Sequence, residues 1–354
     1  MGLPWRNGRA GLAGRAWLTF ALASSAQPAQ AHVKWFAPFN VAGAPATLPD
    51  VLTDPFPLLL LSSMLAMMLI HVGDRMIASA LPRSAIERWF EPWKPQTPDI
   101  MRVTLGAFML CLWLLGGVLL TPELKTGNPA VSWFQLLLAI STLSWSTAWI
   151  AGVGIIILYA VAIAEYGVFH LMDYPLFLGI AAYMIIISRG IERLRPYALS
   201  ILYVAMAQTL LWASVEKWAF WAWTMPLLAQ HNRITFGIDH RTYMVLAGFV
   251  EFVTAFLLLY GRASLRLSAL FLLIVFLAAI IDFGKIDAVG HAMIIASLAI
   301  AIIEGPTHVN RVVQNRIPSH WIGGFEQSLT YLGFLILFFL MYYGLHGLIY
   351  GSLA

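Results

Sequence analysis

The sequence predicts an all-α, polytopic transmembrane helical bundle with about ten spanning helices after a cleaved signal peptide. Three observations lead to this class. The 354 residues are 60% hydrophobic and only 11% charged, which is more apolar than a soluble domain can cover with its polar surface. Ten segments approach the roughly 20 apolar residues that cross a bilayer. The N-terminal residues have the form of a secretory signal.

The signal occupies residues 1–31. Three arginines precede a short apolar stretch at residues 16–26, and residues 29–31 (Ala-Gln-Ala) form a small-x-small cleavage site. Cleavage there makes His32 the mature N-terminus, outside the cytoplasm. The alternative is an uncleaved anchor. The basic and aromatic group that follows, Lys34-Trp35-Phe36, is typical of a membrane interface.

The predicted spans follow one another with short connections. The third and fourth form one uncharged run from Thr126 to Ala164, which we divide near residues 144–147 because it is too long for one crossing. The ten segments are Pro55 to Gly73, Val103 to Pro122, Val131 to Ala148, Ile150 to Val168, Tyr174 to Ser188, Pro196 to Val215, Thr242 to Gly261, Leu267 to Ile281, Ala288 to Ile303 and Gln327 to Tyr350.

The basic residues predict the orientation, because Lys and Arg accumulate in short cytoplasmic loops. With the mature N-terminus outside, both termini are periplasmic and the protein lies in a bacterial inner membrane. The stretch from Arg75 to Pro98 is then a cytoplasmic loop with one amphipathic surface helix. Twelve basic residues fall inside and six outside: Arg75, Arg83, Arg88, Lys94, Arg102, Arg189, Arg193, Arg195, Arg262, Arg266, Arg311 and Arg316, against Lys34, Lys125, Lys217, Arg233, Arg241 and Lys285.

Glu251 is the most unusual charged residue, because it lies midway through the seventh predicted span. An ionisable side chain at that depth costs about 3 kcal/mol on insertion scales. It must therefore face the bundle interior, pair with a donor or stay protonated. A structural hydrogen bond between helices and a role as proton relay or substrate ligand both remain open.

Two further clusters mix acid and base at predicted outer helix ends. Glu216 and Lys217 end the sixth span, and the stretch from Asp282 to His291 joins the eighth and ninth. Such clusters are either ion networks that close helix ends or a site for an anion, a quinone head group or a proton path. The candidate catalytic set is therefore Glu216, Lys217, Glu251, Asp282, Lys285 and His291.

Histidines supply a metal hypothesis. A mature N-terminal His32 chelates copper through its α-amine and imidazole, and His231 and His240 are candidates to complete the site. The alternative is that these are solvated surface histidines. Cys111 is the only cysteine, so neither an intrachain disulfide nor a thiolate cluster is available.

Residues from about Pro196 to Ile303 resemble the DoxX family of bacterial membrane proteins. The resemblance rests on Glu216-Lys217 at the end of a helix, on the helix GFVEFVTAFLLLYG with Glu251 and Gly261, and on Arg262 and Arg266 before an Ala/Leu-rich helix. It implies a four-helix module, in a family whose namesake is associated with quinone-linked oxidation of thiosulfate. The chain then divides into a signal peptide (1–31), a five-helix region (32–195), the DoxX-like module (196–305) and a C-terminal helix (306–354).

These observations favour a periplasm-facing polar and histidine site that is redox-linked through quinone or handles copper. The alternatives are a proton-coupled transporter that uses Glu251, or a non-catalytic scaffold subunit of a membrane complex. The bilayer is the expected partner, together with other membrane or respiratory subunits. Nucleic acid is not expected, because the basic residues are spread along short loops rather than clustered.

Overall fold

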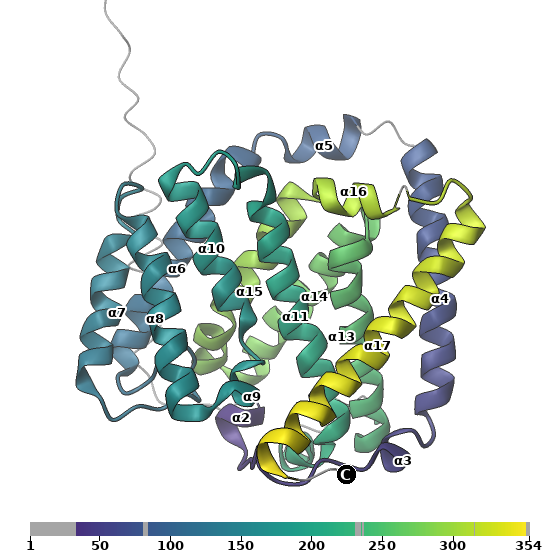
Figure 1. The fold of residues 1–354 in the computed structure, drawn as a ribbon, viewed down its shortest axis with the longest axis horizontal. Coiled ribbons are helices and arrows are strands. Elements are labelled where there is room, and N and C mark those ends of the chain that lie inside the picture. Colours follow the sequence, from purple (N-terminus) through teal and green to yellow (C-terminus); the bar gives the residue numbers. More distant parts are fainter. Residues whose placement is uncertain (1–32, 81–83, 231–234, 236, 315, 352–354) are drawn as a thin grey trace, which may run out of the picture.

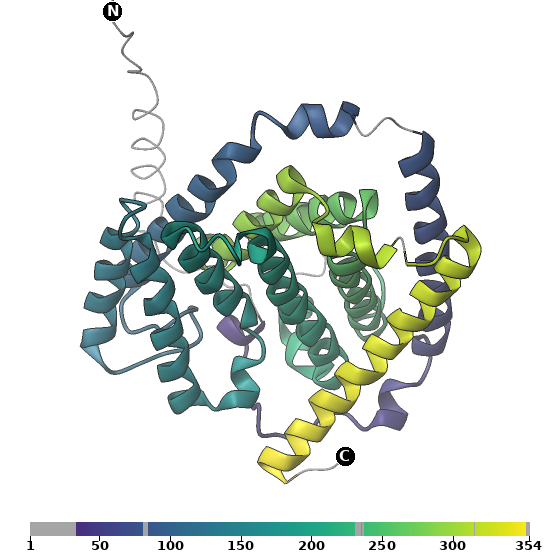
Figure 2. The same ribbon diagram turned by 45° about the horizontal axis from the view of Figure 1, so that its top comes forward.

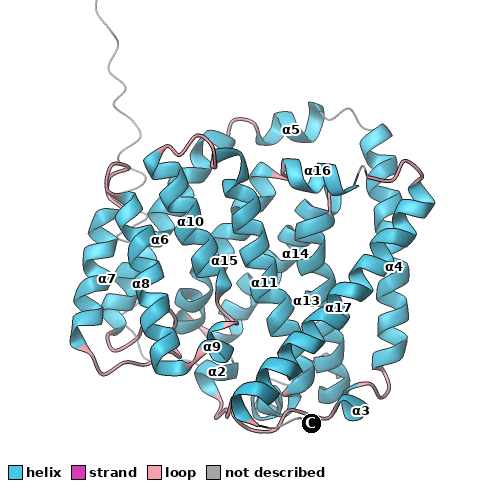
Figure 3. Cartoon of the chain, in the orientation of Figure 1, coloured by secondary structure: helices cyan, strands magenta, loops and turns pink. Residues whose placement is uncertain are grey.

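The computed structural model describes residues 33–80, 84–230, 235, 237–314 and 316–351, and helices dominate this part of the chain (Figure 3). No strand forms within these ranges, and the one isolated bridge pairs Val118 with Lys125. The predicted all-α class is confirmed. The predicted signal peptide and His32 lie outside the described residues.

Ten apolar helices in the described part of the chain correspond to the ten predicted spans. Of these described helices, eight are long and apolar enough to cross a membrane, and two, α7 and α10, are shorter. The chain is therefore a multi-pass membrane protein in contact with lipid. The ten helices are α4 (Phe56–Ala80), α6 (Thr97–Leu115), α7 (Pro129–Ser141), α8 (Ala148–Tyr166), α10 (Pro175–Arg189), α11 (Ala198–Ala219), α13 (His240–Tyr260), α14 (Ala263–Phe283), α15 (Lys285–Glu304) and α17 (His320–Tyr350).

Shorter helices lie in the connections and at the two ends of the bundle. They are α2 (Val33–Phe36), α3 (Leu48–Val51), α5 (Ser84–Phe90), η1 (Lys94–Gln96), α9 (Val168–Leu171), η2 (Arg195–Tyr197), η3 (Trp221–Thr224), α12 (Met225–Gln230) and α16 (His308–Gln314).

Consecutive long helices run in alternating directions, so the short elements separate into two groups. Helices α2, α3 and α9 lie with the C-terminal end of α17 at one end of the bundle, and α5 and α16 lie at the other (Figure 1). We call these the α9 end and the α5 end. Helix α17 has 31 residues, about 46 Å of helix, and it crosses the bundle obliquely (Figure 2). A span longer than a hydrocarbon core of about 30 Å is accommodated in part by such a tilt.

The second predicted span is wrong in its last seven residues, 116–122. Helix α6 ends at Leu115, and Gly116 and Gly117 then adopt φ of 64° and 61°, a conformation that glycine adopts without steric cost. The following hairpin, residues 117–128, turns back into the bundle. The side-chain amide of Gln135 donates hydrogen bonds to the carbonyls of Val118 and Leu119. Non-helical backbone is tolerated at this depth because protein groups satisfy it.

The predicted division of the long uncharged run is confirmed, because α7 ends at Ser141 and α8 begins at Ala148. The predicted amphipathic surface helix is α5, which is only seven residues long. It lies across the α5 end (Figure 1) and leaves Trp89 74% exposed. Helix α4 continues as far as Ala80, so Arg75 belongs to that helix rather than to the loop.

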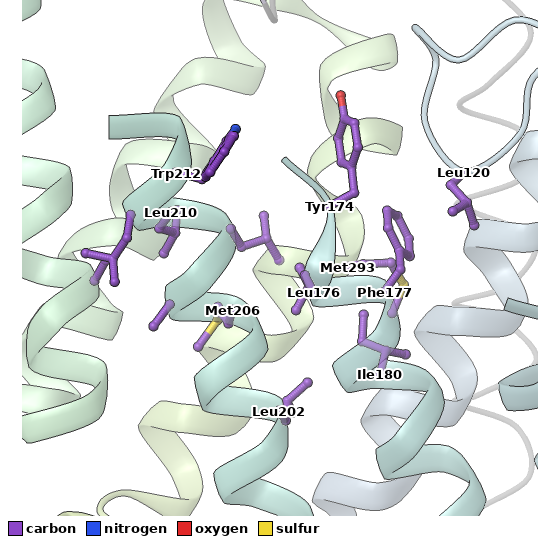
Figure 4. Close-up of a cluster of buried hydrophobic side chains, with 14 of the residues drawn as sticks. Leu120, Tyr174, Leu176, Phe177, Ile180, Leu202, Met206, Leu210, Trp212 and Met293 are labelled. Atoms are coloured by element: carbon purple, nitrogen blue, oxygen red, sulfur yellow. The ribbon is translucent and has the colours of Figure 1, made fainter. Parts of the chain in front are cut away.

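The core is a continuous cluster of large apolar side chains that reaches from α4 to α17. Close packing between helices replaces the hydrophobic driving force that lipid removes. Side chains of α10 and α11 meet in this cluster, and the Tyr174 phenol and Trp212 indole nitrogen lie at the end remote from Leu202 (Figure 4). A Cβ on Gly179 would stand 2.4 Å from the Cβ of Ala205, so this glycine permits the close approach of the two helices.

Candidate functional site

Three elements that are not membrane-spanning helices converge inside the α9 end. They are the first described segment with α2, the hairpin 117–128, and α9 with the residues after it. Each contributes a buried charged or titratable side chain, and α11 adds a partly buried carboxylate. The five groups are Lys34, Glu123, His170, Asp173 and Glu216. We call this set the acid–base chamber.

Lys34 is the centre of the chamber, and its side chain is almost completely buried. Its Nζ donates a short hydrogen bond to Asp173 Oδ2 and lies 2.6 Å from Glu216 Oε2. Burial alone would lower the pKa of this ammonium, but the carboxylates of Asp173, Glu216 and Glu123 outweigh burial and raise it above its ordinary value. The carboxylates therefore favour the charged form of Lys34.

Glu123 and His170 form the second pair of the chamber, through a short contact between Oε1 and Nε2. Aromatic rings enclose the imidazole, with ring centroids 5.4 Å away at Tyr166 and 5.7 Å away at Phe39. Solvent is excluded from both members of the pair. A histidine and a carboxylate in such contact can share a proton and pass it on.

The two pairs are close enough to act together. The charge of Glu123 influences Lys34, and the phenol of Tyr174 lies beside Glu123. Asp173 uses Oδ2 for Lys34, whereas its buried Oδ1 has no hydrogen-bond partner in the part of the chain that the structure describes. Three carboxylates facing one ammonium and one imidazole give the chamber a capacity for further positive charge.

Glu216 and Lys217 were predicted to form one cluster, but these neighbours turn to different partners. Glu216 enters the acid–base chamber, whereas Lys217 Nζ makes a short ion pair with Glu251 on α13. The Lys217 side chain is 32% exposed and the Glu251 side chain 14%. Ser214 Oγ also lies 3.5 Å from the Glu251 carboxylate. The mid-span carboxylate is thus paired, as its insertion cost requires.

The candidate residues between Asp282 and His291 also turn to different surroundings. His291 Nδ1 lies 3.1 Å from Asp287 Oδ1, one helical turn earlier, and its ring centroid is 5.0 Å from that of Trp35. Asp282 is half-buried near the end of α14, and Lys285 is exposed at the start of α15. The buried Asp287 and the partly buried His291 therefore form a pair beside Trp35 of α2, and Lys285 lies outside that pair.

The predicted copper site stays a prediction. His32 and His231 lie outside the described residues, and His240 is the first residue of α13. Among the residues that are described, no three His, Cys, Asp or Glu side chains are grouped so as to hold a metal ion. The lone Cys111 is buried in α6.

Sequence reasoning did not select Lys34, Glu123, His170 or Asp173 as site residues. Lys34 was expected at a membrane interface, and Glu123 fell between the second and third predicted spans without being singled out. The available signal was the interruption itself. Pro122-Glu123 and the stretch from Gly167 to Asp173 place polar residues where two apolar runs break, which in membrane proteins often marks a site.

Comparison with known proteins adds no relative to this description. No family model matches the chain, and neither a curated protein nor a solved structure matches it. The fold and the chamber therefore define the class: an all-α integral membrane protein with buried acid–base groups at one end of its bundle.

Proposed function

We propose that this protein accepts protons at the outer face of a bacterial inner membrane from a lipid-soluble quinol. The observation that carries the proposal is the acid–base chamber, in which the Glu123–His170 pair and the Asp173 and Glu216 carboxylates are enclosed at one end of a membrane bundle. Oxidation of a quinol releases two protons, and buried groups of this kind can receive them. The two electrons pass to a redox partner, in keeping with the predicted respiratory subunits.

A groove between α10 and α11 supports access from the lipid. It has a volume of about 450 Å³, and its lining is almost entirely apolar. That volume lies within the range of small-molecule sites. One end of the groove is formed by Pro175, which directly follows Asp173 and Tyr174 of the chamber region. A quinone ring that moves along α10 toward Pro175 therefore approaches the chamber region at the α9 end.

The orientation is part of the proposal. The loops assigned to the cytoplasm coincide with the α5 end, where Arg102, Arg189, Arg266 and Arg316 are found. The α9 end then faces the periplasm. Cysteine labelling tests this directly, because the native Cys111 is buried. A cysteine at Thr53 should react with an impermeant reagent in intact cells, and one at Glu91 should react only after lysis.

The quinone proposal is tested with a photoreactive ubiquinone analogue in native membranes. Val204 lies in the groove and is 54% exposed, so Val204→Trp should fill the groove and reduce labelling at least fivefold without disturbing the core. Ile274→Trp is the matched control, because Ile274 is 57% exposed on α14 and does not line the groove. Equal labelling of the two variants, or labelling that excess quinone does not compete, would contradict the proposal.

Proton-coupled transport is a second candidate, and the Lys217–Glu251 pair favours it. The pair joins a half-buried lysine near the α9 end to a carboxylate deep in α13, which gives an embedded proton site partial contact with the outside. Proton uptake into proteoliposomes that stops in Glu251→Gln and continues in Glu123→Gln would favour transport over quinol oxidation. Membership of residues 196–303 in the DoxX family, which their resemblance to it suggests, is likewise a proposal.

A further inference from the structure

The segment 33–46 lies across the α9 end like a strap. Apolar and backbone contacts help to hold it: Phe36 packs beside Leu227 and Phe283, the amide of Ala46 donates to the carbonyl of Ala219 at 2.8 Å, and Tyr343 donates to the carbonyl of Ala46 at 2.8 Å. Lys34 is the only charged residue in this segment. One ammonium group thus enters the acid–base chamber on a segment that is not part of any spanning helix.

The surroundings of that ammonium have the features of an ammonium-recognition site. Its Nζ contacts carboxylates from two separate elements, after α9 and on α11. The ring centroids of Trp223 and Phe39 lie 5.8 and 6.0 Å from Nζ, within the range of a cation–π contact. A primary ammonium has three N–H donors, and Asp173 and Glu216 account for two of them.

The chamber also has unused capacity for a cation. Asp173 Oδ1 is buried and unpartnered within the described chain, and Glu123 adds a third carboxylate within electrostatic reach of Lys34. Other titratable groups described near the chamber are His170, His346, Tyr159, Tyr166, Tyr174, Tyr342 and Tyr350, none of them a permanent cation. With Lys34 in place, the carboxylates still outnumber the permanent positive charges.

We propose that the acid–base chamber is a binding site for the primary ammonium group of a small molecule in the outer compartment, and that Lys34 is a tethered occupant of this site. A free ligand displaces Lys34 and lifts α2 from the bundle. The lysine keeps the carboxylates paired while the site is unliganded. This inference goes beyond quinol oxidation and does not depend on it, because the same carboxylates bind an ammonium whether or not a quinol reaches them.

The first test is rescue of Lys34→Ala by n-butylammonium, followed by thermal unfolding of the purified protein in detergent. The variant should unfold at a lower temperature than the wild type, and n-butylammonium should restore at least half of the loss with saturation. Tetramethylammonium, which has no N–H donor, and n-butanol, which has no charge, should not. Lys285→Ala is the matched control, because Lys285 is an exposed lysine at the same end. Equal effects of the three compounds, or equal rescue of the two variants, would overturn the proposal.

A second measurement uses the wild-type protein and needs no folded variant. Acylation of lysines by an amine-reactive ester, read by mass spectrometry, should leave Lys34 protected relative to Lys285. Adding n-butylammonium should increase Lys34 acylation at least threefold and leave Lys285 unchanged. Unchanged protection of Lys34 at saturating ligand would refute displacement. Because this readout contains no quinone, its failure is distinct from failure of the groove experiment.

Discussion

Removing the two members of the Lys217–Glu251 pair should have unequal consequences, because their solvent access differs. Glu251→Gln keeps the shape of the side chain and leaves Lys217, whose 32% exposure lets the ammonium turn to solvent. We expect a loss of about 1 kcal/mol in the free energy of unfolding, discounted for solvent screening. Lys217→Met leaves the Glu251 carboxylate deep in α13 without its partner, and we expect about 3 kcal/mol. The difference between the two losses in the free energy of unfolding distinguishes the exposed partner, Lys217, from the embedded partner, Glu251.

The double variant Lys217→Met/Glu251→Gln completes a double-mutant cycle. It removes both charges, so its loss should be smaller than the sum of the single losses by about 1–2 kcal/mol. Thermal unfolding in detergent measures all four proteins, and 1 kcal/mol corresponds to a shift of about 2 °C in a chain of this size. Additive losses within about 0.5 kcal/mol would refute a direct interaction. A larger loss for Glu251→Gln than for Lys217→Met would refute the assignment of the embedded partner.

Three further predictions concern other parts of the bundle. Asp74 accepts hydrogen bonds from backbone amides at the start of α14, so Asp74→Ala should lower the unfolding temperature by the equivalent of about 2 kcal/mol, with Glu192→Ala on the exposed surface as control. Gly290→Ala places a Cβ 1.8 Å from the Trp35 ring, so it should expose residues 33–46 to protease while α-helical circular dichroism stays unchanged; continued protection would contradict the strap. Burial acts to raise the pKa of Glu87, but hydrogen bonds from cationic partners lower this pKa on balance. The Glu87 carboxylate therefore stabilises the fold above about pH 4.3, and this stabilisation is lost as the pH falls through the lowered pKa. The wild type should therefore exceed Glu87→Gln in unfolding temperature at pH 6, and the gap should close in acid; a gap independent of pH would contradict this assignment.

The sequence predicts the bundle well because lipid imposes one rule on every span. Ten apolar runs became ten helices, and even the division of the longest run fell at the turn between α7 and α8. The end of the second span was predicted wrongly, because apolarity continues through Val118 to Leu120 after the helix ends at Leu115. Hydropathy does not distinguish lipid contact from burial in a protein hairpin.

The candidate site was less predictable, because it depends on contacts between distant segments. Glu216 and Lys217 are adjacent in sequence, but successive residues on a helix point about 100° apart, so they reach different neighbours. Lys34 and Asp173 are separated by 139 positions, and no local pattern in a single sequence reveals such a pair. What the sequence did indicate was the end of the bundle at which titratable groups accumulate.

Infrared difference spectroscopy of the reconstituted protein against pH tests the central claim most directly, because a buried protonated carboxyl has a resolved C=O band. The acid–base chamber predicts at least one such band that titrates and that is lost or shifted in Glu123→Gln or Glu216→Gln. Asp99→Asn, an exposed carboxylate at the α5 end, should leave the band unchanged. A spectrum with no titrating buried carboxyl, or a band that is unaffected by both chamber variants, would contradict proton binding in the chamber.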